Sequence, residues 1–262
     1  MSVGELIKKG FGIALKSKPL IVVLFVFSFV WNLINIPLSQ RLQQANVGIS
    51  LAVVALSLVF ILLSVFMQAG TLAYVRDVIK TGKSTLAVFK DAGLKYYLRI
   101  LAIGVIIGLA VVVLFSLAAL VFVVLGNAPN VLKVLIATVF VVAGIAGVLF
   151  LFLAPYAAVA DEKAVFEAFR SSIDIVKSFF WRLFLTGLVL IVILFVLGFL
   201  IGLIIGLLSA ILKGAAGQLV TGFLSSLLNA YFGIVVTGTF MSFYLAAKPS
   251  AGPGASPRLS PI

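Results

Sequence analysis

The 262-residue sequence contains no cysteine and no histidine. Their absence excludes disulfide bonds, thiol chemistry, zinc or haem sites built on Cys or His, Ser-His triads and histidine proton relays. Acidic residues are scarce as well, since seven Asp and Glu stand beside nineteen Lys and Arg. Charged residues make up 10% of the chain, whereas a soluble domain carries about 25%. The composition therefore predicts neither a soluble domain nor a site for a metal or another cofactor.

What the sequence has instead is long uncharged hydrophobic stretches: 64% of its residues are hydrophobic and its mean hydropathy is +1.35. A helix needs about 20 apolar residues to cross a hydrocarbon core about 30 Å thick. Stretches free of Lys, Arg, Asp and Glu meet this length at 20–38, 48–69, 100–124, 134–156, 183–210 and 219–246. The sequence predicts an all-α polytopic membrane protein with six transmembrane helices, in a single domain over 1–248. The tail 249–262 is rich in Pro, Gly and Ser and is expected to be disordered.

The basic residues are distributed very unevenly between the connections. Sixteen of the nineteen lie on the side that holds both termini, and the other side carries only Arg41, Lys133 and Lys213. The positive-inside rule makes the side with sixteen cytoplasmic. We therefore expect a multi-pass protein of the cell membrane with cytoplasmic N- and C-termini. The net charge of +12 follows from this topology, so it predicts no nucleic-acid partner.

The cytoplasmic segments have the periodicity of amphipathic helices that run into the next span, at 84–98 and 162–180. Ser84 and Asp161 are expected to be their N-caps. With the N-terminal helix they suggest three repeats, each an interfacial helix followed by a transmembrane hairpin. The alternative is that any interfacial helix beside a span contains such residues. Four bases in these helices are candidate contacts for anionic lipid headgroups: Lys95, Arg99, Lys177 and Arg182.

Two segments carry a resemblance to a known family. They are LAPYAAVADEKAVFEAFRSSIDIVKSFFWR at 153–182 and IKKGFGIALKSKP at 7–19. They resemble an uncharacterised prokaryotic family of six-helix membrane proteins, which is similar to the membrane domain of some glycerophosphoryl diester phosphodiesterases. The resemblance implies a six-helix membrane protein without an assigned activity. The phosphodiesterase catalytic domain has no counterpart here, so its hydrolase activity is not carried over.

Polar side chains recur on one face of span one and of span six. Asn32 and Asn35 lie in the first, Ser225 and Asn229 in the second. Polar groups at bilayer depth need partners, so these faces should meet protein or water. One hypothesis is a polar cavity for a small molecule or a lipid headgroup. The other, which we favour from the sequence, is interhelical hydrogen bonding at about 0.6 kcal/mol per bond.

Small residues form a stripe in span five, at Gly198, Gly202, Gly206 and Ala210. Such a stripe lets helix backbones approach closely. It suits either a dimer seam or packing inside one bundle, and the sequence favours packing inside the bundle. Ser50, Ser57 and Ser64 recur every seven residues in span two and are expected to mark another packing face.

The adjacent carboxylates of Asp161 and Glu162 could serve in acid-base chemistry or hold Mg²⁺. Their position at a predicted helix start favours capping instead. The leading functional hypothesis is a non-enzymatic scaffold, assembly or lipid-interacting factor, with membrane lipids and either a protein partner or a second copy as partners. The alternative is a facilitator or translocator of an uncharged or amphiphilic solute or lipid. An intramembrane enzyme comes third. A cavity lined by Asn32 and Asn229 would favour transport, whereas a bundle closed by Gly and Ala seams would favour the scaffold.

Overall fold

The computed structural model describes residues 1–42, 47–126, 129–212 and 214–248, and these ranges contain helices and no strand. The fold is therefore all-α, as the sequence predicts. The helices are α1 (Val3–Lys16), α2 (Lys18–Leu42), α3 (Val47–Thr81), α4 (Leu86–Val124), α5 (Asn130–Leu151), α6 (Ala154–Ala160), α7 (Val165–Leu212) and α8 (Gly214–Ala247). The predicted tail 249–262 lies outside the described residues.

Within these ranges, six segments are long and apolar enough to cross a membrane. They are Lys18–Asn35, Leu51–Thr81, Leu86–Val124, Asn130–Ala160, Val165–Leu212 and Ala216–Ala247. The six predicted spans are thus confirmed by length and composition. Several helices exceed the predicted spans because the adjoining polar segments continue into them without a break. In α7 the join is a kink, since Phe179 has non-helical backbone angles.

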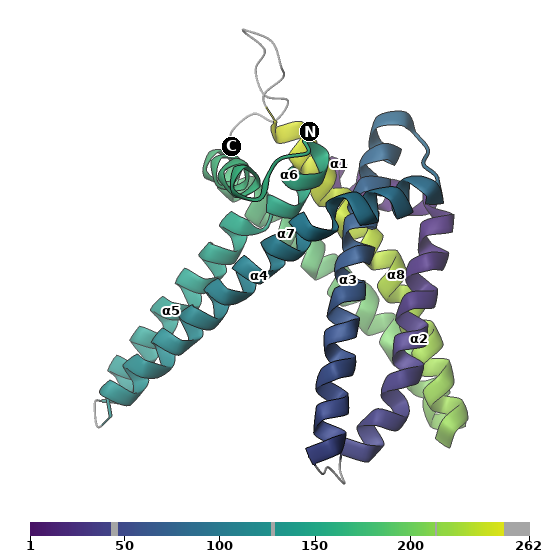
Figure 1. Cartoon of the computed structure of the whole chain (residues 1–262), viewed down its shortest axis with the longest axis horizontal. Coiled ribbons are helices and arrows are strands. Elements are labelled where there is room, and N and C mark those ends of the chain that lie inside the picture. The colour runs from purple at the N-terminus through teal and green to yellow at the C-terminus, as the bar shows by residue number, and fades with distance from the viewer. Residues whose placement is uncertain (43–46, 127–128, 213, 249–262) are drawn as a thin grey trace, which may run out of the picture.

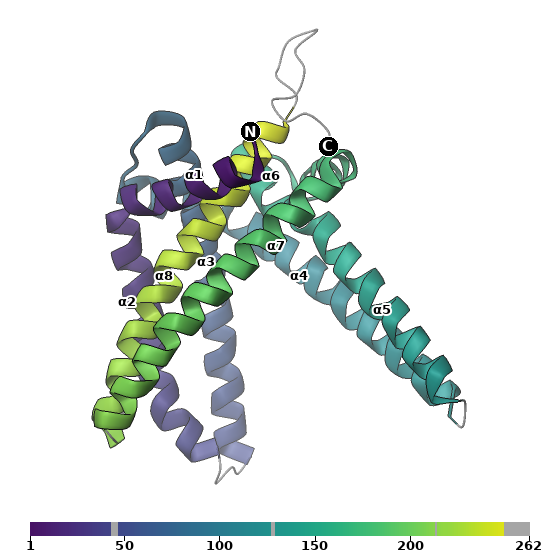
Figure 2. The same cartoon turned by 180° about the vertical axis from the view of Figure 1, so that it is seen from behind.

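The helices meet at one end of the molecule and separate toward the other (Figure 1). The starts of α1, α4 and α7, the short helix α6 and the last turns of α3 and α8 gather at the same end. Most described Lys and Arg residues belong to these segments or adjoin them, so we call it the basic end. Away from it, the α4–α5 hairpin diverges from α2, α3 and α8, as the view from behind also shows (Figure 2).

The protein core lies at the basic end rather than at mid-height. Among the largest fully buried side chains are Leu6, Tyr74, Tyr96, Leu153 and Tyr244. The hairpin helix α5 buries no residue at all. In a bilayer, apolar side chains on the diverging halves are solvated by lipid tails, so they need no cover from protein.

Helix α1 packs directly on α8. A capping box starts it: Glu5 N–H donates to Ser2 Oγ (3.3 Å) and Ser2 N–H donates to Glu5 Oε2 (2.7 Å). Further along, a Cβ placed on Gly238 would lie 3.3 Å from the Cα of Gly10, and one on Gly10 would overlap Thr239 Oγ1. The two glycines allow the backbones to cross in contact, which attaches the N-terminal helix to the last span.

The glycine stripe of α7 does not pack inside the bundle, so that interpretation is wrong. A Cβ on Gly198, Gly202 or Gly206 would meet nothing within 4 Å, and Ala210 is exposed. The residues that α7 buries between its kink and its end are instead Leu183, Thr186, Leu190 and Ile205. The dimer-seam alternative stays a prediction, as does the threefold repeat.

The predicted cap at Ser84 is also wrong. The N-cap of α4 is Thr85, which makes no capping hydrogen bond with its side chain. The Ser84 hydroxyl oxygen is buried without a hydrogen-bond partner. The helix begins one residue later than the sequence pattern suggests, after a connection in which the Thr81 hydroxyl donates to the Lys83 carbonyl (2.6 Å).

We expect Gly10→Ala to destabilise the protein by about 1–3 kcal/mol, because its methyl group must displace Thr239 or the Val235 carbonyl. Gly12→Ala is the matched control, since its Cβ would meet nothing within 4 Å and the gain in helix propensity is the same, about 1 kcal/mol. Thermal unfolding in detergent should separate the two variants. Equal melting temperatures would contradict the close crossing of α1 and α8.

Candidate functional site

Polar stripes from three helices face a common cavity of about 460 Å³. The stripes are Ser28 and Asn32 on α2, Ser64, Gln68 and Thr71 on α3, and Asn229 and Thr237 on α8. Spacings of three, four or eight residues put each stripe on one side of its helix. The fourth contributor is α6, through Tyr156. The volume is within the range of about 300–1,000 Å³ typical of small-molecule sites.

The structure brings together two of the four residues predicted to line a cavity. Asn32 and Asn229 both line it. Asn32 Nδ2 also donates to Ser226 Oγ (2.8 Å), which joins α2 to α8. Asn35 Nδ2 donates to the Trp31 carbonyl of its own helix (3.2 Å), and Ser225 is not among the cavity residues. The structure therefore has an interhelical hydrogen bond from Asn32 beside an open polar volume, and a ligand for that volume stays a prediction.

Two hydroxyls of α3 are buried in this wall without a partner. Ser64 Oγ and Thr71 Oγ1 make no hydrogen bond to any described residue, and Thr71 is only 6% exposed. At bilayer depth an unsatisfied hydroxyl costs free energy, because no bulk water is present to pair with it. Because Ser64 and Thr71 both line the cavity, a molecule inside it is one source of such partners.

Sequence reasoning missed most of the α3 wall. Thr71 lies beyond the predicted end of its span, and Ser64 was assigned to a packing face with Ser57, which is in fact exposed. The side chain of Ser50 lies outside the described part. The spacing of Ser64, Gln68 and Thr71 was the signal that could have identified this wall, since it puts three polar residues on one helix side.

Aromatic rings form another part of the cavity lining. Trp31 stacks on Phe60 with ring centroids 4.0 Å apart, and Phe27 stacks on the same ring at 5.5 Å. All three residues line the cavity. This wall adds flat apolar surface to the hydrogen-bonding groups of the lining, so the cavity suits a molecule with both kinds of surface.

The cavity is closed toward the basic end and open at its side. Leu72 and Tyr156 are 3% and 7% exposed, and they line the part nearest that end. Gln68 on α3 and Asn229 on α8 line the cavity and are nevertheless exposed. The opening thus lies between α3 and α8, on a surface within the span segments, where the surroundings are lipid.

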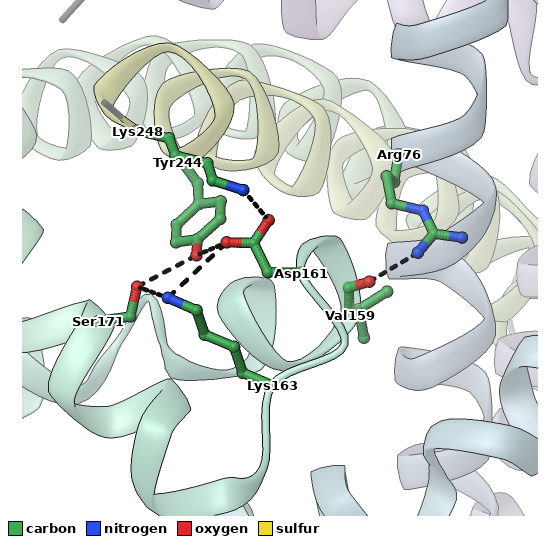
Figure 3. Close-up of polar contacts among 7 residues, drawn as sticks. All are labelled: Arg76, Val159, Asp161, Lys163, Ser171, Tyr244 and Lys248. Atoms are coloured by element: carbon green, nitrogen blue, oxygen red, sulfur yellow. Dashed lines mark hydrogen bonds and ion pairs between the residues drawn. The ribbon is translucent and has the colours of Figure 1, made fainter. Parts of the chain in front are cut away.

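Helix α6, which closes the cavity, is held in place at its carboxyl end. Arg76 of α3 donates from Nη1 to the Val159 carbonyl (2.7 Å) (Figure 3). The last carbonyls of a helix have no partner within the helix, so this bond satisfies one of them.

The predicted capping role of Asp161 is wrong. It is the C-cap of α6, not the N-cap of the next helix, which begins at Val165. A carboxylate at this helix end is unfavourable, and its neighbours offset that: Tyr244 Oη and Lys248 Nζ each donate to it at 2.8 Å. Lys163 Nζ lies 3.9 Å away and donates to Ser171 Oγ (2.9 Å). The Asp161 cluster (Asp161, Lys163, Ser171, Tyr244 and Lys248) joins α6, α7 and α8 (Figure 3).

Glu162 points to a different helix. Its Oε1 accepts hydrogen bonds from Lys95 Nζ (2.8 Å) and Tyr96 Oη (2.7 Å) of α4, and its carbonyl accepts one from Arg99 (2.8 Å). The bonds from Lys95 and Tyr96 hold the pKa of the Glu162 carboxyl below its ordinary value. A left-handed backbone at Glu162, with φ +57°, lets the chain reverse between α6 and α7. The two carboxylates therefore do not converge on a common site.

The four predicted headgroup contacts differ in their surroundings. Lys95 and Arg99 are engaged with Glu162, Lys177 is exposed, and Arg182 is half-buried. Among the described residues, no group of three or more Asp and Glu is placed to hold a metal ion.

A second crevice, of about 790 Å³, lies at the basic end beside the Asp161 cluster. Its walls mix acidic and basic side chains, among them Glu167, Arg170 and Asp174, and these three are exposed. Exposed charges of both signs are solvated as they stand. The intramembrane cavity, with its unpaired buried hydroxyls, is therefore the stronger candidate site.

Fold and site together define a multi-pass helical membrane protein with a polar cavity inside its span region. The chain belongs to the family described as "Domain of unknown function (DUF7847)", whose family model matches residues 1–247. No curated protein and no solved structure shows a significant match to it.

We expect Tyr244→Phe to lower stability by about 1–3 kcal/mol, because the nearly buried Asp161 carboxylate loses a hydrogen-bond donor. Tyr231→Phe on the same helix is the control, since the described residues offer its hydroxyl no hydrogen-bond partner. The measurement is thermal unfolding in detergent. If the two variants melted together, the Asp161 cluster would not hold α6 to α8.

Proposed function

We propose that this chain is a non-enzymatic membrane protein that binds an amphiphilic molecule in the cavity between α2, α3 and α8. The observation that carries the proposal is the pair of buried, unpaired hydroxyls of Ser64 and Thr71 in the cavity wall. The lateral opening at Gln68 and Asn229 makes the bilayer the source of the bound molecule.

A binding role without catalysis fits the groups available. The cavity is lined by hydroxyl, amide and apolar side chains, and Tyr156 is its one titratable residue within the described part. Proton transfer in catalysis is usually performed by His, Asp, Glu or Lys. The adjacent carboxylates Asp161 and Glu162 are taken up by hydrogen bonds and ion pairs to different helices.

Translocation is the second candidate. Gln68 and Asn229 are amide side chains exposed within span segments, where they could pair with a polar headgroup as it crosses. A scaffold role depends on a different surface, the open small-residue stripe of α7, where a second copy or another membrane protein could pack.

Orientation and lipid preference belong to the same proposal. The base-rich connections put the basic end in the cytoplasm of a cell-membrane protein, where exposed Lys177 could attract anionic lipid. The likeness to the membrane domain of glycerophosphoryl diester phosphodiesterases is likewise proposed as kinship of the membrane part alone, without hydrolase activity.

If the cavity binds an amphiphile, protein purified in mild detergent should retain a lipid class that is enriched over the host membrane. We expect Asn229→Ala to retain about fivefold less, as loss of one hydrogen bond of about 1 kcal/mol predicts. Ser225→Ala, one turn away and outside the cavity, should retain as much as the wild type. Mass spectrometry of the extracted lipids measures this. An extract with the composition of the host membrane would overturn the proposed function.

The orientation can be tested cleanly because the chain has no natural cysteine. Lys90 and Asn130 are both exposed, in the first turns of α4 and α5. An impermeant maleimide added to intact cells should label the Asn130→Cys variant, and should label Lys90→Cys only after the cells are opened. The reverse pattern would contradict the orientation, and labelling of both variants from one side would contradict the alternation of spans.

A further inference from the structure

We infer that the molecule bound in the cavity is a lipid whose polar part is uncharged and carries hydroxyl groups, of the diacylglycerol type. This inference rests on the proposed function and narrows the ligand. Three features that lie together in the cavity support this inference. They are a set of uncharged hydrogen-bonding groups, an aromatic wall and an opening toward lipid.

The absence of charge from the lining argues against a charged headgroup. Among the described residues that line the cavity, none is Lys, Arg, Asp or Glu. The closest charged side chain in α3 is Arg76, and it is engaged with Val159 beyond buried Leu72. A phosphate or an ammonium group at bilayer depth would have no counter-charge, and burying an unpaired ion costs several kcal/mol.

The hydrogen-bonding groups match a hydroxyl ligand. The hydroxyls of Ser64 and Thr71 can each donate and accept, and so can the amides of Gln68 and Asn229 taken as whole groups. A ligand hydroxyl also donates and accepts, so it can pair with any of them in either direction. A phosphate that only accepts, or an ammonium that only donates, would leave part of this lining unsatisfied.

Size and access point to a lipid rather than to free glycerol. The volume of about 460 Å³ holds a glycerol-sized polar part together with the first part of its chains, which can lie against Phe27, Trp31 and Phe60. The remainder of the chains can leave through the opening between Gln68 and Asn229 into the bilayer. The basic end, where Leu72 and Tyr156 close the cavity, offers a water-soluble molecule no entry.

The experiment uses the full chain in phosphatidylcholine nanodiscs, with trace amounts of photoactivatable diacylglycerol, phosphatidylglycerol or phosphatidylcholine. After irradiation, mass spectrometry maps the adducts on peptides. We expect diacylglycerol to label the cavity segments of α3 and α8 at least fivefold more than either phospholipid. Excess unlabelled diacylglycerol should suppress this labelling, whereas free glycerol should not.

The diagnostic variant is Thr71→Val, which keeps the shape of the side chain and removes a hydroxyl that has no partner in the protein. It should melt like the wild type and lose diacylglycerol labelling about fivefold. Thr138→Val is the matched control, because that hydroxyl is exposed on α5 and bonds to its own helix (2.9 Å).

The outcomes separate the two proposals. If a phospholipid labelled the cavity as strongly as diacylglycerol, and this labelling depended on Thr71, the bound lipid would not need an uncharged polar part. That result would overturn this inference and leave the proposed function standing. Suppression by free glycerol would overturn the lipid form of the ligand. If the Thr71→Val variant lost labelling by none of the lipids, both the lipid class and the proposed function would be overturned.

Discussion

The constraint on which the rest of this structure depends is that bilayer depth offers polar groups no water. Backbone amides satisfy it by forming helices, and the Lys, Arg, Asp and Glu side chains satisfy it by lying outside the six predicted spans. Some of the hydroxyls that remain in the spans bond to a carbonyl of their own helix, as those of Thr186 and Thr239 do. Other hydroxyls and amides gather where the stripes of α2, α3 and α8 face each other across a cavity of about 460 Å³. Asn32 finds a partner there in Ser226, whereas Ser64 and Thr71 do not.

The basic end gives these diverging helices a fixed arrangement. Helix α6 lies among α3, α4, α7 and α8, and nearly all of its residues are buried. Arg76 binds its last turn, Asp161 connects it to α8, and Glu162 after it connects to α4. Because Tyr156 of the same helix closes the cavity, these polar contacts also determine that the cavity opens sideways. The long halves of α4 and α5 take no part in this and face lipid.

The candidate site was predictable only in part. Asn32 and Asn229 stand out in the sequence because a polar residue inside an otherwise apolar span is conspicuous. Thr71 does not, because it lies past the predicted span end, and Ser64 was interpreted from a seven-residue spacing that Ser57 does not support. The capping role assigned to Asp161 was wrong because the alanine-rich residues 154–160 resemble the end of a span in the sequence. In the structure they form a separate helix with Pro155 in its first turn, and the carboxylate of Asp161 follows that helix.

The sequence by itself determined the solvent and the plan of the chain: six apolar segments, no Lys, Arg, Asp or Glu within the predicted spans, and basic residues concentrated on alternate connections. These properties follow from composition and order along the chain, because the transfer of a span into lipid depends on its own residues. Only the tertiary structure decided which faces meet. The α7 glycines stay open while Gly10 and Gly238 touch, and three separate stripes become one wall around a cavity. Such pairings depend on helix rotation and crossing, which the spacing within a single helix does not contain.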